Sequence, residues 1–131
     1  DLSYSEGAFI AKENLEATFL KIKSPKKLPV FVLDKEDLMS IFYSFSRSKD
    51  INFKQHPVFS SRFFLYGDDR KAIRSLFSSD LISFFESQPT YHVESNGNSV
   101  LIKGADRLAS IEEIKKMMAF AEGLGDVLAE K

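Results

Sequence analysis

Two runs of alternating apolar and polar residues flank an Asn96-Gly97 pair in the segment TYHVESNGNSVLIK, residues 90–103. Asn-Gly readily adopts the positive φ angles of a two-residue type I′ turn, so this segment predicts a β-hairpin. With Asn96-Gly97 as the loop, Val93 would pair with Val100 on the apolar face of the hairpin. At least part of the fold must therefore be an antiparallel sheet.

The first third of the chain has further strand patterns. Residues 16–23 (EATFLKIK) alternate as a strand with a mainly apolar inner face. Residues 28–33 (LPVFVL) are a second β-rich run, in which Pro29 suits a strand start or an edge position. Residues 8–10 (AFI), together with Tyr4, supply an earlier strand. This third of the chain is predicted to be mostly sheet.

The aromatic segment FSSRFFLYG, residues 59–67, is predicted to enter the core as a strand. The His56-Pro57 pair predicts an extended backbone leading into it, because the residue before proline is disfavoured in the helical region. Alternation within residues 63–66 gives two apolar faces, with Phe63 on one and Phe64 on the other. We therefore expect this strand to be covered on both sides.

Helix signals lie between the strands. Asp34 can cap a helix whose apolar positions, at spacings of three and four residues, are Leu38, Ile41, Phe42 and Phe45. Asp68-Asp69 follow a glycine at a place where acidic residues favour the start of a helix. The apolar positions within residues 72–77 and 81–85 predict one bent helix or two short ones.

The last helix is expected to begin with a capping box formed by Ser110 and Glu113. A helical period predicts that its buried side consists of Ile111, Ile114, Met118, Ala121, Leu124 and Leu128. Gly123 and Gly125 lower the helix propensity of this segment and indicate close packing or fraying near its end.

Together these segments predict a single α+β domain over residues 1–131, with a mostly antiparallel sheet of about five or six strands and three helices packed largely on one face. A chain of 131 residues with 44% hydrophobic content is sufficient for a self-supporting core. The chain begins Asp1-Leu2-Ser3-Tyr4, without methionine or a signal-like stretch, so we expect it to be part of a longer protein.

The sequence shows no constellation of catalytic residues. Without cysteine there is no thiolate nucleophile and no sulfur metal site. His92, beside Glu94, is interpreted as a solvent-facing histidine, and His56 as a loop residue fixed by Pro57. Asp68-Asp69 are interpreted as a helix start rather than as a metal-binding pair. We therefore expect no catalytic residue, no metal site and no cofactor.

Charge excludes one class of partner. The 18 basic and 19 acidic residues leave a net charge of −1, which offers no field to attract nucleic acid. Positive charge gathers around the SPKK turn, in Lys21, Lys23, Lys26 and Lys27. Such a cluster is commonly a solvated loop, and alternatively it orients a tethered domain on an anionic membrane leaflet. The sequence has no apolar run near the roughly 20 residues of a membrane span, so a soluble chain is predicted.

Three stretches resemble a known group of proteins: residues 17–20 (ATFL) ahead of 28–33 (LPVFVL), residues 50–69 (DINFKQHPVFSSRFFLYGDD), and residues 73–77 (IRSLF) with 84–86 (FFE). They are similar to uncharacterised bacterial proteins in which a soluble domain follows one or more membrane helices. The resemblance carries no established activity to any residue. It implies a membrane-anchored parent protein and a domain on the cytoplasmic side.

Two functions remain open on these grounds. The first is a non-catalytic soluble binding or scaffolding domain of a membrane-anchored bacterial protein, whose protein partner would contact an aromatic patch around Phe59, Phe64 and Tyr66. The alternative is a small-molecule or lipid-binding pocket, or a weak enzyme, between the phenylalanine-rich helices and the sheet. In that case the two histidines or Asp68-Asp69 would line the cleft. The ligand-binding residues are not identified by the sequence.

Overall fold

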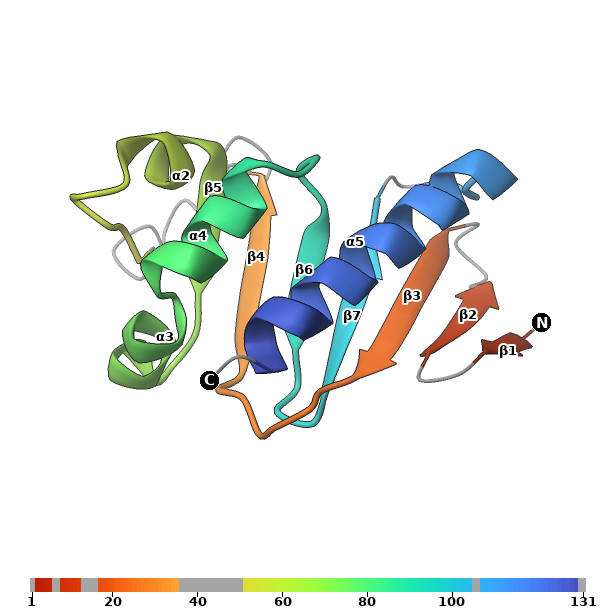
Figure 1. Cartoon of the computed structure of the whole chain (residues 1–131), viewed down its shortest axis with the longest axis horizontal. Helices are drawn as coiled ribbons and strands as arrows, with labels where there is room; N and C mark the ends of the chain where they lie inside the picture. The colour runs from red at the N-terminus through yellow and green to blue at the C-terminus, as the bar shows by residue number, and fades with distance from the viewer. Residues whose placement is uncertain (1, 6–7, 13–16, 36–50, 105–106, 130–131) are drawn as a thin grey trace.

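A single antiparallel sheet is the centre of the molecule. The computed structural model describes residues 2–5, 8–12, 17–35, 51–104 and 107–129. In this part of the chain seven strands lie in the order β1-β2-β3-β7-β6-β4-β5 (Figure 1). They are β1 (Leu2–Ser5), β2 (Ala8–Lys12), β3 (Thr18–Lys23), β4 (Phe31–Lys35), β5 (Phe63–Tyr66), β6 (His92–Ser95) and β7 (Ser99–Lys103).

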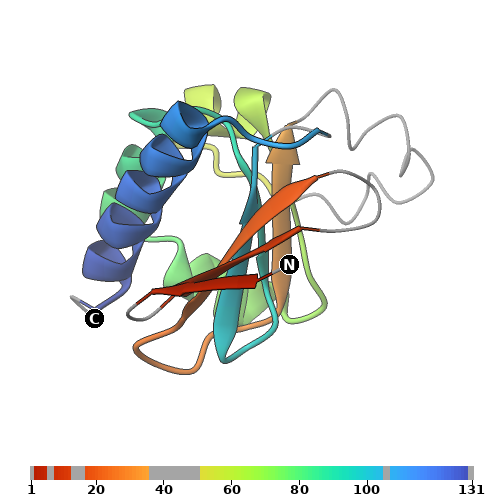
Figure 2. The same ribbon diagram turned by 90° about the vertical axis from the view of Figure 1, so that its right-hand side faces the viewer.

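The helices gather on one side of this sheet, as Figure 2 shows. They are α2 (Pro57–Arg62), α3 (Arg70–Leu76), α4 (Ser79–Glu86) and α5 (Ile111–Ala129). The predicted α+β class is therefore confirmed, with seven strands instead of five or six and four helices among the described residues instead of three. The helix predicted over Leu38 to Phe45 lies outside the described residues.

The predicted hairpin is present, but its register differs from the prediction. Val93 pairs with Ile102 and Ser95 with Val100, so Gly97-Asn98 forms the two-residue loop. The Asn96 side chain explains the shift, because its Oδ1 accepts hydrogen bonds from the Asn98 and Ser99 amides and the Asn96 amide donates to the Ser99 carbonyl. Gly97 then takes the position with positive φ, 104°. Because the pairing moves by two residues, the predicted apolar face is retained.

The β6–β7 hairpin is inserted between β3 and β4, although β3 and β4 are consecutive in the sequence. The connection between them therefore crosses the tip of the hairpin. The Ser24 amide donates to the Asn98 carbonyl at 2.9 Å, and the Leu28 amide donates to the Gly97 carbonyl at 2.8 Å. The SPKK turn is thus fixed against the hairpin loop.

Residues 57–62 are helical, so the extended backbone predicted before Phe63 is wrong. Pro57 stands in the first turn of α2, where the missing amide proton breaks no helical hydrogen bond. The Phe59 amide donates to the Glu86 carboxylate at 3.0 Å, which secures α2 to the end of α4. The strand begins at Phe63, and the predicted coverage of both its faces is confirmed, because Phe63, Phe64 and Leu65 are all buried.

Residues 70–86 form two short helices, one of the two predicted arrangements. Asp69 caps α3 by accepting from the Ala72 amide at 3.0 Å, as predicted for this acidic pair. Ser78 caps α4 by accepting from the Leu81 amide at 3.3 Å. Rings from the helices, from β4 and β5 and from the adjoining loops form a continuous phenylalanine cluster, which consists of Phe31, Phe53, Phe59, Phe63, Phe77, Phe85 and Phe120.

The capping box of α5 is confirmed, since the Ser110 amide donates to Glu113 Oε1 at 2.8 Å and the Glu113 amide donates to Ser110 Oγ at 3.1 Å. The predicted buried side of α5 is wrong in its first half, where Ile111 is 72% exposed. Met117 and Phe120 are the buried residues there instead, because the Phe120 ring packs against the Tyr91 ring with a centroid distance of 4.7 Å. Farther along, the predicted burial of Ala121, Leu124 and Leu128 is confirmed.

Candidate functional site

A groove opens on the helix side of the sheet, beside the first turns of α5. Its volume is about 510 Å³, within the range of small-molecule sites. It lies between the start of β3, the end of β4, the segment before β6, the segment after β7 and α5 itself. Its uncharged lining residues are Thr18, Pro89, Thr90, Tyr91, Gly104, Ala109 and Met117.

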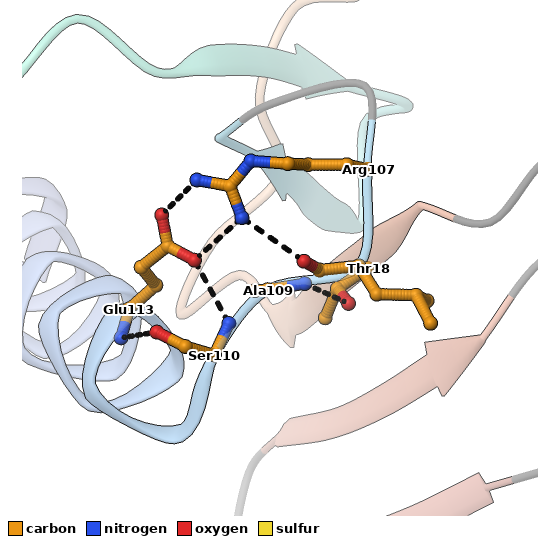
Figure 3. A network of polar contacts seen from close by, with 6 residues as sticks. Thr18, Arg107, Ala109, Ser110 and Glu113 are labelled. Carbon is orange, nitrogen blue, oxygen red and sulfur yellow. Dashed lines mark hydrogen bonds and ion pairs between the residues drawn. The ribbon is translucent and has the colours of Figure 1, made fainter.

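A polar network fixes the segment that leads from β7 into α5 (Figure 3). The Ala109 amide donates to Thr18 Oγ1 at 2.9 Å, which ties this segment to β3. The Arg107 guanidinium donates to both Glu113 carboxylate oxygens, at 2.9 and 2.6 Å, and to the Leu108 carbonyl at 3.1 Å. The groove therefore has one wall held in place by a bidentate ion pair and a helix cap.

The charged residues that line the groove are three bases, Lys35, Arg107 and Lys116, and one acid, Glu113. Hydrogen bonds from Arg107, and then from the Ser110 amide, lower the pKa of Glu113 to about 2. Glu113 is thus ionised at neutral pH and already neutralised by Arg107. Burial, and then the charge of Glu113, raise the pKa of Tyr91, which keeps its phenol protonated. The lining has an excess of two positive charges.

His92 lies on the opposite side of the sheet, in a cluster that the sequence did not predict. Its Nδ1 is 2.5 Å from Asp34 Oδ2 and its Nε2 is 3.2 Å from Glu94 Oε2. His92 is therefore half-buried and paired, and the prediction that it faces solvent is wrong. The predicted role of Asp34 as a helix cap is also wrong, because Asp34 is a buried residue of β4.

This cluster keeps the His92 ring positively charged and does not present it as a reactive group. Burial lowers the pKa of His92, but the hydrogen bonds that its ring donates to Asp34 and Glu94 outweigh this effect and raise the pKa to about 9. The hydrogen bond from His92 in turn lowers the pKa of Glu94. Both ring nitrogens are engaged by carboxylates, so neither is available to a substrate or a metal. In the described part of the chain no group of three or more acidic or histidine side chains is arranged to hold a metal ion.

The His92 cluster makes stability depend on pH. Because folding raises the pKa of His92 from 6.5 to about 9, the stability it contributes is complete below the lower value and is lost as pH rises through the upper one. We expect the free energy of unfolding to fall by about 2 kcal/mol across this window, allowing for screening of a partly exposed group. Urea unfolding of the native protein and of His92→Gln at several pH values measures it.

The His92→Gln variant should lack this part of the pH dependence, since glutamine does not titrate. The informative quantity is the difference between the two proteins, because other groups that titrate in the same window contribute equally to both. Parallel pH profiles for the native protein and His92→Gln would contradict the assignment.

The other residues singled out by the sequence are dispersed. His56 Nε2 is 3.4 Å from Ser79 Oγ at the start of α4, and neither residue belongs to the groove lining. Asp68 and Asp69 are exposed at the start of α3. Of the SPKK lysines, Lys23 and Lys27 are exposed. None of these residues lines the groove.

The prediction of an exposed aromatic patch is wrong as well. Phe59 and Phe64 are both buried, and Tyr66 is half-buried. Phe59 lies inside the phenylalanine cluster, because α2 turns it toward Phe63 with a centroid distance of 4.9 Å. These three rings do not form an exposed surface for a protein partner.

Comparison with known proteins gives one finding about the fold. No family model matches the chain, and no curated protein matches it. The chain is similar to the crystal structure of the mycobacterial trehalose monomycolate transport factor A, TtfA, with a TM-score of 0.65 and 14% sequence identity. The match covers 97% of this chain and 69% of that chain. At this identity the similarity shows a common fold.

Among the described residues, no helix combines the length and the apolar character that crossing a membrane requires.

Proposed function

We propose that this chain is a non-catalytic binding domain of a membrane-anchored bacterial protein, on the cytoplasmic side, and that its groove binds an amphiphilic small molecule. The observation that carries the proposal is the groove itself, which combines an apolar wall with a basic rim. The fold it has in common with a factor named for trehalose monomycolate transport is consistent with a lipid-like ligand.

The apolar wall is packed against the core, which favours binding without a large rearrangement. Met117 is buried, and the Tyr91 ring meets Phe120 edge to face. An aromatic contact of this kind holds the ring in one orientation. The wall therefore offers a preformed apolar surface, the usual basis of a small-molecule site.

The lining does not support the alternative of a weak enzyme. Neither histidine contributes to it, and its carboxylate, Glu113, is occupied by Arg107 and has a pKa of about 2. A general base is most effective when its pKa is near neutral pH. Binding, rather than acid–base catalysis, is the function that these residues favour.

Gly104 offers a direct test of the groove. A Cβ built there would lie 3.5 Å from the Tyr91 ring and 3.8 Å from Met117 Sδ, both ordinary contacts, so a larger side chain would extend into the groove. We expect Gly104→Phe to weaken binding of the uncharged fluorescent probe N-phenyl-1-naphthylamine by at least about tenfold, which corresponds to 1.4 kcal/mol. Probe titration by fluorescence measures the change.

Gly104→Ala is the matched control, because its methyl group fits without filling the groove, and its affinity for the probe should stay near that of the native protein. Circular dichroism and urea unfolding establish that both variants are folded. The proposal is wrong if the native protein does not bind the probe, or if a folded Gly104→Phe variant binds it with unchanged affinity.

A further inference from the structure

We propose that the groove selects amphiphiles with an anionic head group, a carboxylate or a phosphate, and that Lys35 and Lys116 bind this group. The inference rests on the proposed function and adds the class of ligand. Its basis is the distribution of charge in the lining, where three bases accompany a single acid.

The one acid among the described lining residues, Glu113, is not available to repel an anion or to neutralise the lysines. Both oxygens of Glu113 accept hydrogen bonds from Arg107, and Oε1 also accepts from the Ser110 amide. Among the described residues no carboxylate forms an ion pair with Lys35 or Lys116. Among the described residues, the positive charge of the groove that no carboxylate pairs with therefore belongs to these two lysines.

The two lysines reach the groove from different elements. Lys35 is the last residue of β4, and strand alternation places it on the same side of the sheet as Leu33, the helix side. Lys116 lies on α5 directly before Met117, the buried residue of the apolar wall. A head group at the rim would meet the ammonium groups while its tail meets Tyr91 and Met117.

Arg107 is a positioning residue in this arrangement. Both terminal nitrogens of its guanidinium donate to Glu113 and one of them also donates to the Leu108 carbonyl, so its charge is already paired with a carboxylate. Lysine ammonium groups are compact charges without a fixed fork geometry, so they accommodate a carboxylate and a phosphate alike. The geometry thus specifies the charge of the head group.

Ligands with the same tail and different head groups test the inference. Dodecanoate, dodecyl phosphate, dodecanol and dodecyltrimethylammonium would each compete with N-phenyl-1-naphthylamine, below the concentrations at which they form micelles. We expect the two anions to displace the probe at up to about tenfold lower concentration than dodecanol, the upper range of the gain from two ion pairs with exposed lysines. The cationic ligand should be weakest, and added salt should reduce the preference for anions.

Variants then assign the preference to residues. The double variant Lys35→Gln/Lys116→Gln should bind dodecanol as the native protein does and lose the preference for dodecanoate. Lys115→Gln is the matched control, because Lys115 is exposed on the same helix, carries the same charge and does not line the groove. It should keep the preference almost entirely.

The outcomes separate the two proposals. If dodecanol and dodecanoate displace the probe equally from the native protein, the selection of anions is refuted while binding of amphiphiles stands. If the double variant keeps the preference, the assignment to Lys35 and Lys116 is refuted. If none of the ligands displaces the probe, the proposed function fails together with the inference.

Discussion

Replacing Phe59 by alanine is expected to lower the free energy of unfolding by about 3 to 5 kcal/mol, the range for removing a fully buried ring from a packed core. Phe59 has 0% exposure. Its ring lies within 4.9 to 6.4 Å, centroid to centroid, of four others, those of Phe53, Phe63, Phe77 and Phe85. The cavity left by alanine would be enclosed by rings from the segment before α2, from β5, from the residue that ends α3 and from α4, which leaves little freedom to collapse.

Urea unfolding followed by far-ultraviolet circular dichroism measures this loss. Val58→Ala is the control, because Val58 precedes Phe59 in the same helix and is 57% exposed. We expect it to change stability by less than about 0.5 kcal/mol. Similar losses for the two variants would mean that Phe59 is not the centre of this cluster.

Gly67→Ala should be the second most damaging substitution. A Cβ at Gly67 would lie 2.4 Å from Ile73 Cδ1 and 2.6 Å from the Val30 carbonyl oxygen. The carbonyl belongs to the backbone just before β4, so it cannot move aside as a flexible side chain would. We expect a loss of about 3 kcal/mol, toward the upper end of overpacking costs. Thermal and urea unfolding both measure it.

Gly125→Ala provides the control with the opposite sign. A Cβ at Gly125 meets no atom within 4 Å, and Gly125 lies inside α5. Alanine has the higher helix propensity, so this variant should be more stable by about 0.5 to 1 kcal/mol. A destabilised Gly125→Ala, or a Gly67→Ala as stable as the native protein, would show that these packing distances do not govern the two sites.

Sequence patterns were most informative where the cause is local. Alternation and β-rich composition predicted strands over residues 16–23, 28–33 and 63–66, which overlap β3, β4 and β5, and capping patterns predicted the helix starts at Asp69 and Ser110. The class of fold follows from these elements. The register of the hairpin could not be predicted in this way. It depends on whether Asn96 is a residue of the two-residue loop or stands before the loop and fixes it through side-chain hydrogen bonds.

The wrong predictions depend on tertiary contacts. Asp34 has the sequence context of a helix cap, but its partner is His92, distant in the sequence and brought close by the pairing of β4 with β6. In α5 the periodic pattern fits two faces, and the contact of Phe120 with Tyr91 selects the one that leaves Ile111 exposed. Neither the partner of Asp34 nor the buried face of α5 can be predicted from the sequence of a single strand or helix.

The groove was hidden from sequence reasoning for the same reason. Its lysines, Lys35 and Lys116, are far apart in the chain and neither belongs to a recognisable motif. The capping box of α5 was visible in the sequence, while the bidentate bond of Arg107 to Glu113 was not. A basic residue three positions before a capping box is the one signal that could have pointed to this network.

The insertion of the β6–β7 hairpin between β3 and β4 has a consequence for synthesis of the chain. On the ribosome β3 and β4 emerge long before residues 92–103, and until those residues arrive each has one unpaired edge. Open edges readily pair with other molecules, so a nascent or truncated chain that stops before this point is prone to aggregate. Closure of the sheet must await the C-terminal part, and pairings this distant in sequence make folding slow.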